Sequence, residues 1–329
     1  MAKELKIGKV KIGEKHPPVL FPDIGTFFNQ DIKLAEKLIL KLINDGAKII
    51  KGEILHNPDI ALKTERKEPY LSDKRKIIKE NLRKIIERKI LPLSTYEKIF
   101  SVCKKKKVDF ILSVYDFEGA SFAKEIGSSA LKIASSNITH KPLIEYVCKL
   151  GLPVILDTGK SSYDEIKKSI SWFKRNKFSK LHLQHSPYAP PHSLKKHDLL
   201  MIKTFLKKFD FTVGLSDHHN SNIMLYAAVA LGASTVEKGI KTKLIKNDQD
   251  VYHAMDIEDF KLINKNLIEI KIAMGKSMRV LKKNDPKHLY RMGIIAKETI
   301  KNGTKLKANN LTFAFPKKGV PVEEFDKIL

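Results

Sequence analysis

An apolar run ends abruptly within FTVGLSDHHNSN, residues 211–222, where Ser216, Asp217, His218 and His219 follow one another. Because side chains alternate across a strand, Ser216 and His218 share one face and Asp217 takes the other. A hydroxyl beside an imidazole can support a phosphate-like group next to a metal ion or an acid–base residue. We expect Asp217 to bind a backbone amide or a helix start, and His219 to turn towards the following helix.

Two lysines, Lys51 in AKIIKGEI and Lys132 in ALKIASS, each interrupt a strand that is otherwise apolar. Lysine is almost never buried without a partner, so the pair predicts an anion held between them. The alternative is a set of internal ion pairs, Lys51 with Asp23 and Lys132 with Asp157.

His218 and His185 end consecutive predicted strands. Neighbouring strands lie about 4.8 Å apart, so both imidazoles can approach one divalent cation at about 2.0–2.2 Å. The competing interpretation makes His218 a general base or a hydrogen-bonded structural residue.

Short apolar runs alternate with amphipathic segments of helical length, which is typical of a parallel sheet built from βα units. About eight such units in roughly 275 residues predict a TIM (β/α)8 barrel. No GxGxxG sequence follows the first run, which disfavours a dinucleotide-binding fold. The predicted strands are residues 19–25, 47–54, 109–115, 130–136, 153–159, 180–186, 211–217 and 234–240.

The chemistry of a TIM barrel lies at the carboxyl ends of its strands. The polar residues at those ends are therefore predicted to meet at one mouth. They are Asp23, Lys51, Glu53, Ser113, Lys132, Ser135, Asp157, Lys160, His185, Ser216, Asp217, His218, Glu237 and Lys238.

The barrel is expected to span residues 1–276, followed by a linker at 277–289 and a small β-rich appendage at 290–329. The appendage has alternating apolar residues and a turn at Asn302-Gly303. Residues 55–107 are too long for one connection, and we interpret them as an insertion beside the mouth.

The insertion contains two helical patterns. SDKRKIIKENLRKIIERK, residues 72–89, predicts one helix, and TYEKIFSVCKKKK, residues 95–107, predicts another.

Composition sets broader limits. The chain has 329 residues and a formal net charge of +25, but nearly all of the excess is lysine, and no zinc-finger or helix-turn-helix pattern accompanies it. We therefore expect no nucleic-acid partner. The absence of an apolar run long enough for a signal peptide or membrane span predicts a soluble, cytoplasmic protein with no membrane partner. Only Cys103 and Cys148 occur, so a disulfide framework is not expected.

Several motifs occur in the order known from one family. GLSDHH followed by AAVALGASTVEKGI resembles the sialic acid synthase (N-acetylneuraminate synthase) family, whose strands read G-x-S-D-H-T and A-L-G-A-x-x-x-E-K-H. ALKIASSNITHKPLI, LDTGKSSYDEI and LHLQHSPYAPP resemble further motifs of this family. IIAKETIKNGTKLKANNLTFAFP resembles the opening half of its antifreeze-like (SAF) domain.

The resemblance implies an enzyme that condenses phosphoenolpyruvate with an N-acylated hexosamine to a nonulosonic acid, with Mn²⁺ or Mg²⁺ polarising the sugar aldehyde. It implies a homodimer, in which each antifreeze-like domain covers the partner's barrel. By analogy Asp23 orients water or stabilises a cationic centre, and His218 holds the metal. The residues placed around the substrates are Lys51, Glu53, Ser113, Lys132, Ser135, Asn137, Ser216 and Asp250.

Some positions depart from the family pattern. Gly239 stands where a second metal-binding histidine is expected, and His185, in place of an asparagine, is the predicted replacement ligand. Other departures are Glu53 for glutamine, Val114 for threonine, Asn137 for glutamate, Asp157 for serine and Phe315 for arginine. The leading hypothesis is therefore a divergent synthase of this type. The alternative is a repurposed or inactive relative that binds a sugar or a protein without turnover.

Overall fold

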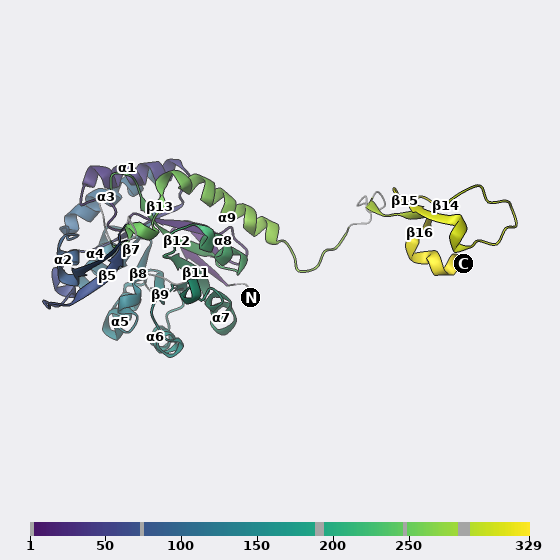
Figure 1. Ribbon diagram of the computed structural model, residues 1–329. Helices are drawn as coiled ribbons and strands as arrows, with labels where there is room; N and C mark the ends of the chain where they lie inside the picture. Colours follow the sequence, from purple (N-terminus) through teal and green to yellow (C-terminus); the bar gives the residue numbers. More distant parts are fainter. Residues whose placement is uncertain (1–2, 73–75, 188–193, 246–248, 282–289) are drawn as a thin grey trace. The chain divides into compact units, whose positions relative to one another are not determined.

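The computed structural model describes residues 3–72, 76–187, 194–245, 249–281 and 290–329 (Figure 1). Contacts divide the chain into two compact units, Met1–Gly275 and Lys276–Leu329. Each unit is described separately. No helix among the described residues is long and apolar enough to cross a bilayer.

Parallel strands in the first unit close into an eight-stranded barrel (Figure 1). The barrel closes because β12 pairs with both β11 and β3. This confirms the predicted TIM (β/α)8 fold, and a short β13 (Met255–Asp256) extends the sheet beside β12. The barrel strands are β3 (Val19–Asp23), β4 (Ile49–Glu53), β7 (Asp109–Val114), β8 (Ala130–Ile133), β9 (Val154–Asp157), β10 (Leu181–His185), β11 (Thr212–Asp217) and β12 (Thr235–Lys241).

Helices surround the barrel and pack their apolar faces on the strands (Figure 1). In α6, for example, Ile166, Ile170 and Phe173 are buried, and Ser162 and Glu165 form a capping box that fixes the helix start. The helices are α1 (Ile32–Asn44), α3 (Leu93–Lys106), α4 (Phe117–Glu125), α5 (Lys141–Leu150), α6 (Tyr163–Arg175), α7 (Met201–Lys208), α8 (Ile223–Ala230) and α9 (Phe260–Met274).

The insertion differs from its prediction. Within the predicted helix over 72–89, residues 73–75 lie outside the described residues, and the rest holds a strand, β6 (Ile77–Asn81), and a short α2 (Leu82–Glu87). Strand β6 pairs antiparallel with β5 (Lys67–Leu71). Asn81 caps α2 by accepting a hydrogen bond from the Lys84 amide, so the helix cannot start earlier. The backbone of β6 pairs with β5, and local periodicity does not reveal such a cross-strand partner.

The second predicted helix of the insertion, α3, belongs to the barrel. It connects β4 to β7, and its Tyr96, Ile99 and Phe100 lie in the main core. The Phe100 ring stacks on Phe110 of β7 with centroids 5.0 Å apart.

An N-terminal hairpin that the sequence did not suggest lies under the barrel. β1 (Glu4–Ile7) pairs antiparallel with β2 (Val10–Gly13). Its Ile7 and Ile12 are fully buried against apolar side chains from the barrel strands. We call this cluster the barrel floor; it consists of Ile7, Ile12, Val19, Phe21, Ile49, Ile111, Ala130 and Ile155.

The second unit contains a three-stranded antiparallel sheet, in which β14 (Gly293–Ala296) lies between β15 (Leu311–Ala314) and β16 (Val320–Pro321). A short α10 (Phe325–Ile328) follows. The unit therefore has a β-sheet in the part predicted to be β-rich, and its antifreeze-like identity stays a prediction. Most of the predicted linker, residues 282–289, lies outside the described residues.

Candidate active site

Two adjoining cavities lie at the carboxyl ends of the barrel strands. The inner pocket has a volume of about 180 Å³ and the outer pocket about 1010 Å³. They adjoin because both are lined by Tyr115, Ser135, His218, Gln249 and Asp250. The predicted site residues that line the inner pocket are Asp23, Lys51, Glu53, Ser113, Lys132, Ser135, Ser216, His218 and Asp250.

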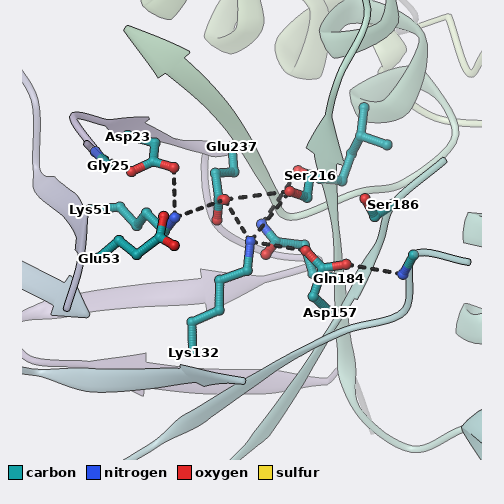
Figure 2. A network of polar contacts seen from close by, with 12 residues as sticks. Asp23, Gly25, Lys51, Glu53, Lys132, Asp157, Gln184, Ser186, Ser216 and Glu237 are labelled. Carbon is teal, nitrogen blue, oxygen red and sulfur yellow. Dashed lines mark hydrogen bonds and ion pairs between the residues drawn. The ribbon is translucent and has the colours of Figure 1, made fainter. Parts of the chain in front are cut away.

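The two lysines are both only 4% exposed, and both are ion-paired (Figure 2). Lys51 Nζ lies 2.6 Å from Asp23 Oδ2, and Lys132 Nζ lies 2.9 Å from Asp157 Oδ2. These are the pairs that the sequence left open as the alternative to an anion. A bound anion must therefore share the lysines with carboxylates that are already present.

Glu237 on β12 connects the two pairs, as Figure 2 shows. Its Oε1 lies 2.5 Å from Lys132 Nζ and 3.6 Å from Lys51 Nζ. Glu53 also stands beside Lys51 (Figure 2) and accepts a hydrogen bond from the Tyr115 hydroxyl. The mouth thus sets two ammonium groups against the carboxylates of Asp23, Glu53, Asp157 and Glu237, and its formal charge is negative.

The carboxylates in this network differ in acidity. Burial raises the pKa of Asp23 to about 6, against the opposing effect of Lys51, and Glu237 and Glu53 add to the rise. Burial alone would raise the pKa of Glu237 too, but Lys132 and Lys51 lower it to about 2. Glu237 is therefore a fixed negative charge, whereas Asp23 can exchange a proton near neutral pH.

The lysines remain cationic. Desolvation alone would lower the pKa of Lys132, but Glu237 and Asp157 outweigh it and raise that pKa. For Lys51 the same competition ends with a raised pKa, because Asp23, Glu237 and Glu53 surround it.

Tight turns after the strands aim two of the carboxylates. Asp23 Oδ1 accepts a hydrogen bond from the Gly25 amide at 2.7 Å, and Asp157 Oδ1 accepts one from the Gly159 amide at 3.0 Å. Gly25 has a φ of 38°, in the left-handed region that favours glycine. These bonds hold one oxygen of each carboxylate and leave the other for a lysine.

The serines and Asn137 lie around the same mouth. Ser216 Oγ is 3.3 Å from Lys132 Nζ, and Ser113 is opposite Lys132 in the β7–β8 register. Ser135 begins a 3₁₀ turn, η2 (Ser135–Asn137), and lines both pockets. Asn137 lines the outer pocket, and its side-chain amide donates a hydrogen bond to the Tyr115 carbonyl at 3.4 Å.

Asp217 has a structural role, as the alternation of side chains predicted. Its Oδ1 accepts a hydrogen bond from the His219 amide at 3.0 Å, and its Oδ2 lies 2.6 Å from Lys238 Nζ. Lys238 also donates to the backbone carbonyls of His219 and Ser221, so this pair holds the loop after β11.

His185 lies on the outer face of β10, which corrects its predicted pairing with His218. Its Nε2 donates a hydrogen bond to the His197 carbonyl at 2.7 Å, and its ring packs edge-on against Phe205 of α7. Alternation explains this, because Gln184 takes the inner face, where Figure 2 shows it among the residues of the mouth. His185 lines neither pocket.

His218 instead meets His253, on the 3₁₀ turn η4 (Val251–His253). The two rings are edge-on, with centroids 4.8 Å apart. His218 Nδ1 lies 3.3 Å from Ser186 Oγ, and His253 Nε2 lies 3.6 Å from Asp250 Oδ1. Nothing in the sequence marks His253, because contact with His218 requires the chain to fold back after β12.

No group of three or more His, Cys, Asp or Glu side chains in the described part of the chain is arranged to hold a metal ion. Two imidazoles do fit one, because His218 and His253 both line the inner pocket with ring centroids 4.8 Å apart, and neutral imidazole is the metal-binding form. Gly239 contributes no ligand. A Cβ at Gly239 would lie 2.9 Å from Phe27 Cε2, so the Phe27 ring fills the space beside it.

Comparisons with known proteins agree with the fold. The model of the NeuB family matches residues 38–279. The chain belongs to the NeuB family. Among its relatives is an uncharacterised protein of Methanocaldococcus jannaschii, 30% identical over 99% of this chain and 93% of that protein.

Two further comparisons give similar coverage of the chain. The N,N'-diacetyllegionaminic acid synthase of Campylobacter jejuni is 25% identical and covers 94% of both chains. The crystal structure of N-acetylneuraminic acid (sialic acid) synthetase from Leptospira borgpetersenii, in complex with citrate, superposes with a TM-score of 0.75. It is 23% identical and covers 88% of this chain and 96% of that chain, and it shows the same fold.

Proposed function

We propose that this NeuB-family protein is a cytoplasmic nonulosonic acid synthase that condenses phosphoenolpyruvate with an N-acyl hexosamine-type aldehyde. The observation that carries the proposal is the pairing of the two cavities. A small inner pocket with two buried lysines opens beside an outer pocket of about 1010 Å³, large enough for a sugar. The synthases among its relatives support the same reaction class.

In this proposal the inner pocket takes phosphoenolpyruvate. Lys51 and Lys132 bind its anionic groups, and the hydroxyls of Ser113, Ser135 and Ser216 donate hydrogen bonds to its oxygens. Entry of the anion is opposed by the carboxylates of the mouth. Phosphoenolpyruvate must therefore compete with Asp23 and Asp157 for the two lysines.

The reaction forms one carbon–carbon bond and breaks one bond to phosphate. C3 of phosphoenolpyruvate joins the aldehyde carbon, water adds at C2, and inorganic phosphate leaves. Asp23 is the proposed acid–base residue for the water, because its pKa lies near neutrality and its Oδ1 is held by the Gly25 amide. His218, where both pockets meet, is the second proposed catalytic residue.

The sugar is assigned to the outer pocket. Asp250 and Asn137 line it and are the proposed contacts to hydroxyl or N-acyl groups, while Glu53 reaches the same region through its hydrogen bond with Tyr115. A divalent cation, Mn²⁺ or Mg²⁺, held at His218 would polarise the aldehyde oxygen.

We also propose that the protein works as a homodimer. The second unit presents an apolar strand, in which Phe313 and the following Phe315 are 44% and 60% exposed. An exposed apolar edge strand of this kind is expected to be buried against another protein surface. Sedimentation should show a dimer at micromolar concentration, and a monomer would contradict this part of the proposal.

One observation favours the alternative, a relative that binds without turnover. Asp157 occupies Lys132 at 2.9 Å and places a negative charge where the phosphate would lie. If this charge alone prevents turnover, Asp157→Asn should strengthen anion binding and produce phosphate release.

The test is a coupled phosphate-release assay with phosphoenolpyruvate, Mn²⁺ and a panel of N-acyl hexosamines, with the keto-acid product identified by mass spectrometry. The proposal predicts phosphate release that depends on one sugar of the panel and is lost in Lys132→Ala. Binding of both substrates without phosphate release would favour the alternative. Absence of phosphoenolpyruvate binding would contradict the proposed use of the inner pocket.

A further inference from the structure

The pair of imidazoles at the junction of the two pockets carries an inference about this chain's own ligands. We propose that His253 and His218 together bind one divalent cation, with water and substrate supplying its remaining ligands. This deepens the proposed function and rests on it for the identity of the substrate.

Geometry supports the pair. Two imidazoles that share one ion at metal–nitrogen distances of about 2.0–2.2 Å place their ring centroids roughly 4.5–5.5 Å apart. The observed separation is 4.8 Å. Both side chains line the inner pocket beside the outer one, so an ion between them would face the reacting groups.

The second nitrogen of each ring faces a polar group of the kind that orients histidine ligands. His218 Nδ1 lies 3.3 Å from Ser186 Oγ, and His253 Nε2 lies 3.6 Å from Asp250 Oδ1. A hydrogen bond donated by Nδ1 of His218 to Ser186 Oγ leaves Nε2 of His218 as its ligand atom.

The electrostatics favour a cation at this place. Asp157 and Asp250 act on His218, and the carboxylates of the mouth outnumber its lysines. A divalent cation would offset this imbalance and so help a phosphate ester to enter.

Gly239 has no side chain to bind a metal ion, so a second histidine ligand must come from another part of the chain. The Phe27 ring would lie 2.9 Å from a Cβ at this position, and it packs with Val251 and Ala254, on either side of His253 along the chain. The aromatic ring therefore fills the room beside β12 and supports the turn that presents His253.

The test measures Mn²⁺ binding to the full-length protein by calorimetry and by the electron paramagnetic resonance of free Mn²⁺. The wild type should bind one ion per chain, and His253→Gln should weaken binding by at least about 100-fold. His185→Gln is the matched control, since it changes a buried histidine at a strand end in the same way, and it should bind like the wild type. Thermal melting and phosphoenolpyruvate binding show whether each variant is folded.

Unchanged Mn²⁺ affinity in folded His253→Gln, or no binding by the wild type, would overturn the inference and leave the phosphate-release assay to decide the reaction. Mn²⁺ binding that requires His253 but accompanies no phosphate release would support the metal site and contradict the proposed function.

Moving the second histidine back to β12 gives an independent test. In His253→Ala, the added changes Gly239→His and Phe27→Ala return an imidazole to β12 and make room for it. Recovery of Mn²⁺ binding supports the proposed substitution of one histidine by the other. A folded triple variant that fails to bind contradicts it.

Discussion

The two ends of the barrel interior are built from the same strands but have opposite chemistry. At the floor, Phe21, Ile49 and Ile155 pack with the N-terminal hairpin and are fully buried. Two residues further along their strands stand Asp23, Lys51 and Asp157, the charged groups of the mouth (Figure 2). One pleat, about 6.6 Å of strand, therefore separates the apolar floor from the charged mouth.

One position at the level of the floor is polar but neutral: His182 on β10 lies opposite Ile155 in the β9–β10 register. His182 is fully buried and bonds to the hydroxyls of Thr212 at 2.8 Å and Thr235 at 2.7 Å. Burial lowers its pKa to about 3, so it stays uncharged. The comparison teaches that alternation along the strands decides which side chains point into the barrel. The types of those side chains then decide whether they stabilise the fold or can bind a ligand.

Breaking the floor should cost stability and spare chemistry. Phe21→Ala is expected to lower the free energy of unfolding by about 3–5 kcal/mol, because it leaves a cavity in a fully packed cluster. Denaturant unfolding measures the loss. At a temperature where the variant is folded, phosphate release per folded molecule should match the wild type, and a large fall would show that the floor and the mouth are coupled.

Removing a charged group of the mouth should instead lower activity and leave the protein folded. Lys51→Met is expected to lower phosphate release about 100–1000-fold, the usual effect of removing one charged or hydrogen-bonding partner of the reacting groups. Lys48→Met is the matched control, because Lys48 is exposed just before the same strand. Equal activity of the two variants would rule out a role for Lys51.

Crowding the space beside Gly239 should lower the stability of the protein by a smaller amount. Gly239→Ala would press its methyl group against Phe27, and crowding of this kind costs typically about 1–3 kcal/mol. Thermal melting of Gly239→Ala and of Gly239→Ala/Phe27→Leu compares the two. Stability should return in the double variant, whereas an unaffected single variant would contradict the close fit of the ring.

The smallest effect concerns pH. If ionised Asp23 assists the water, kcat/KM should rise with pH through an apparent pKa of about 6. Glu53→Gln removes one of the charges that raise this pKa, so the rising limb should move to lower pH. A limb that stays in place would assign it to another group.

The sequence predicted the barrel and most of the residues at its mouth, because both leave local signals. Apolar runs alternate with amphipathic segments, and Lys51 and Lys132 interrupt runs in which charge is rare. The sequence also offered the ion pairs of both lysines as an alternative, and these pairs are present.

What the sequence could not reveal depends on contacts between distant segments. Strand β6 was predicted as part of a helix over 72–89, because its partner strand β5 is not visible in local periodicity. His185 was assigned to the mouth by its place at a strand end, although the strand turns it outward. The meeting of His218 with His253 arises only once the loop after β12 folds back over the pocket.

The central claim is that the lysines of the mouth bind phosphoenolpyruvate in competition with their own carboxylates, and calorimetric titration tests it most directly. Phosphoenolpyruvate should bind the wild type. Its binding free energy should be weaker by about 1.5–3 kcal/mol in Lys132→Ala, and its affinity should be higher in Asp157→Asn. Equal binding by wild type and Lys132→Ala, or no binding by the wild type, would contradict the claim.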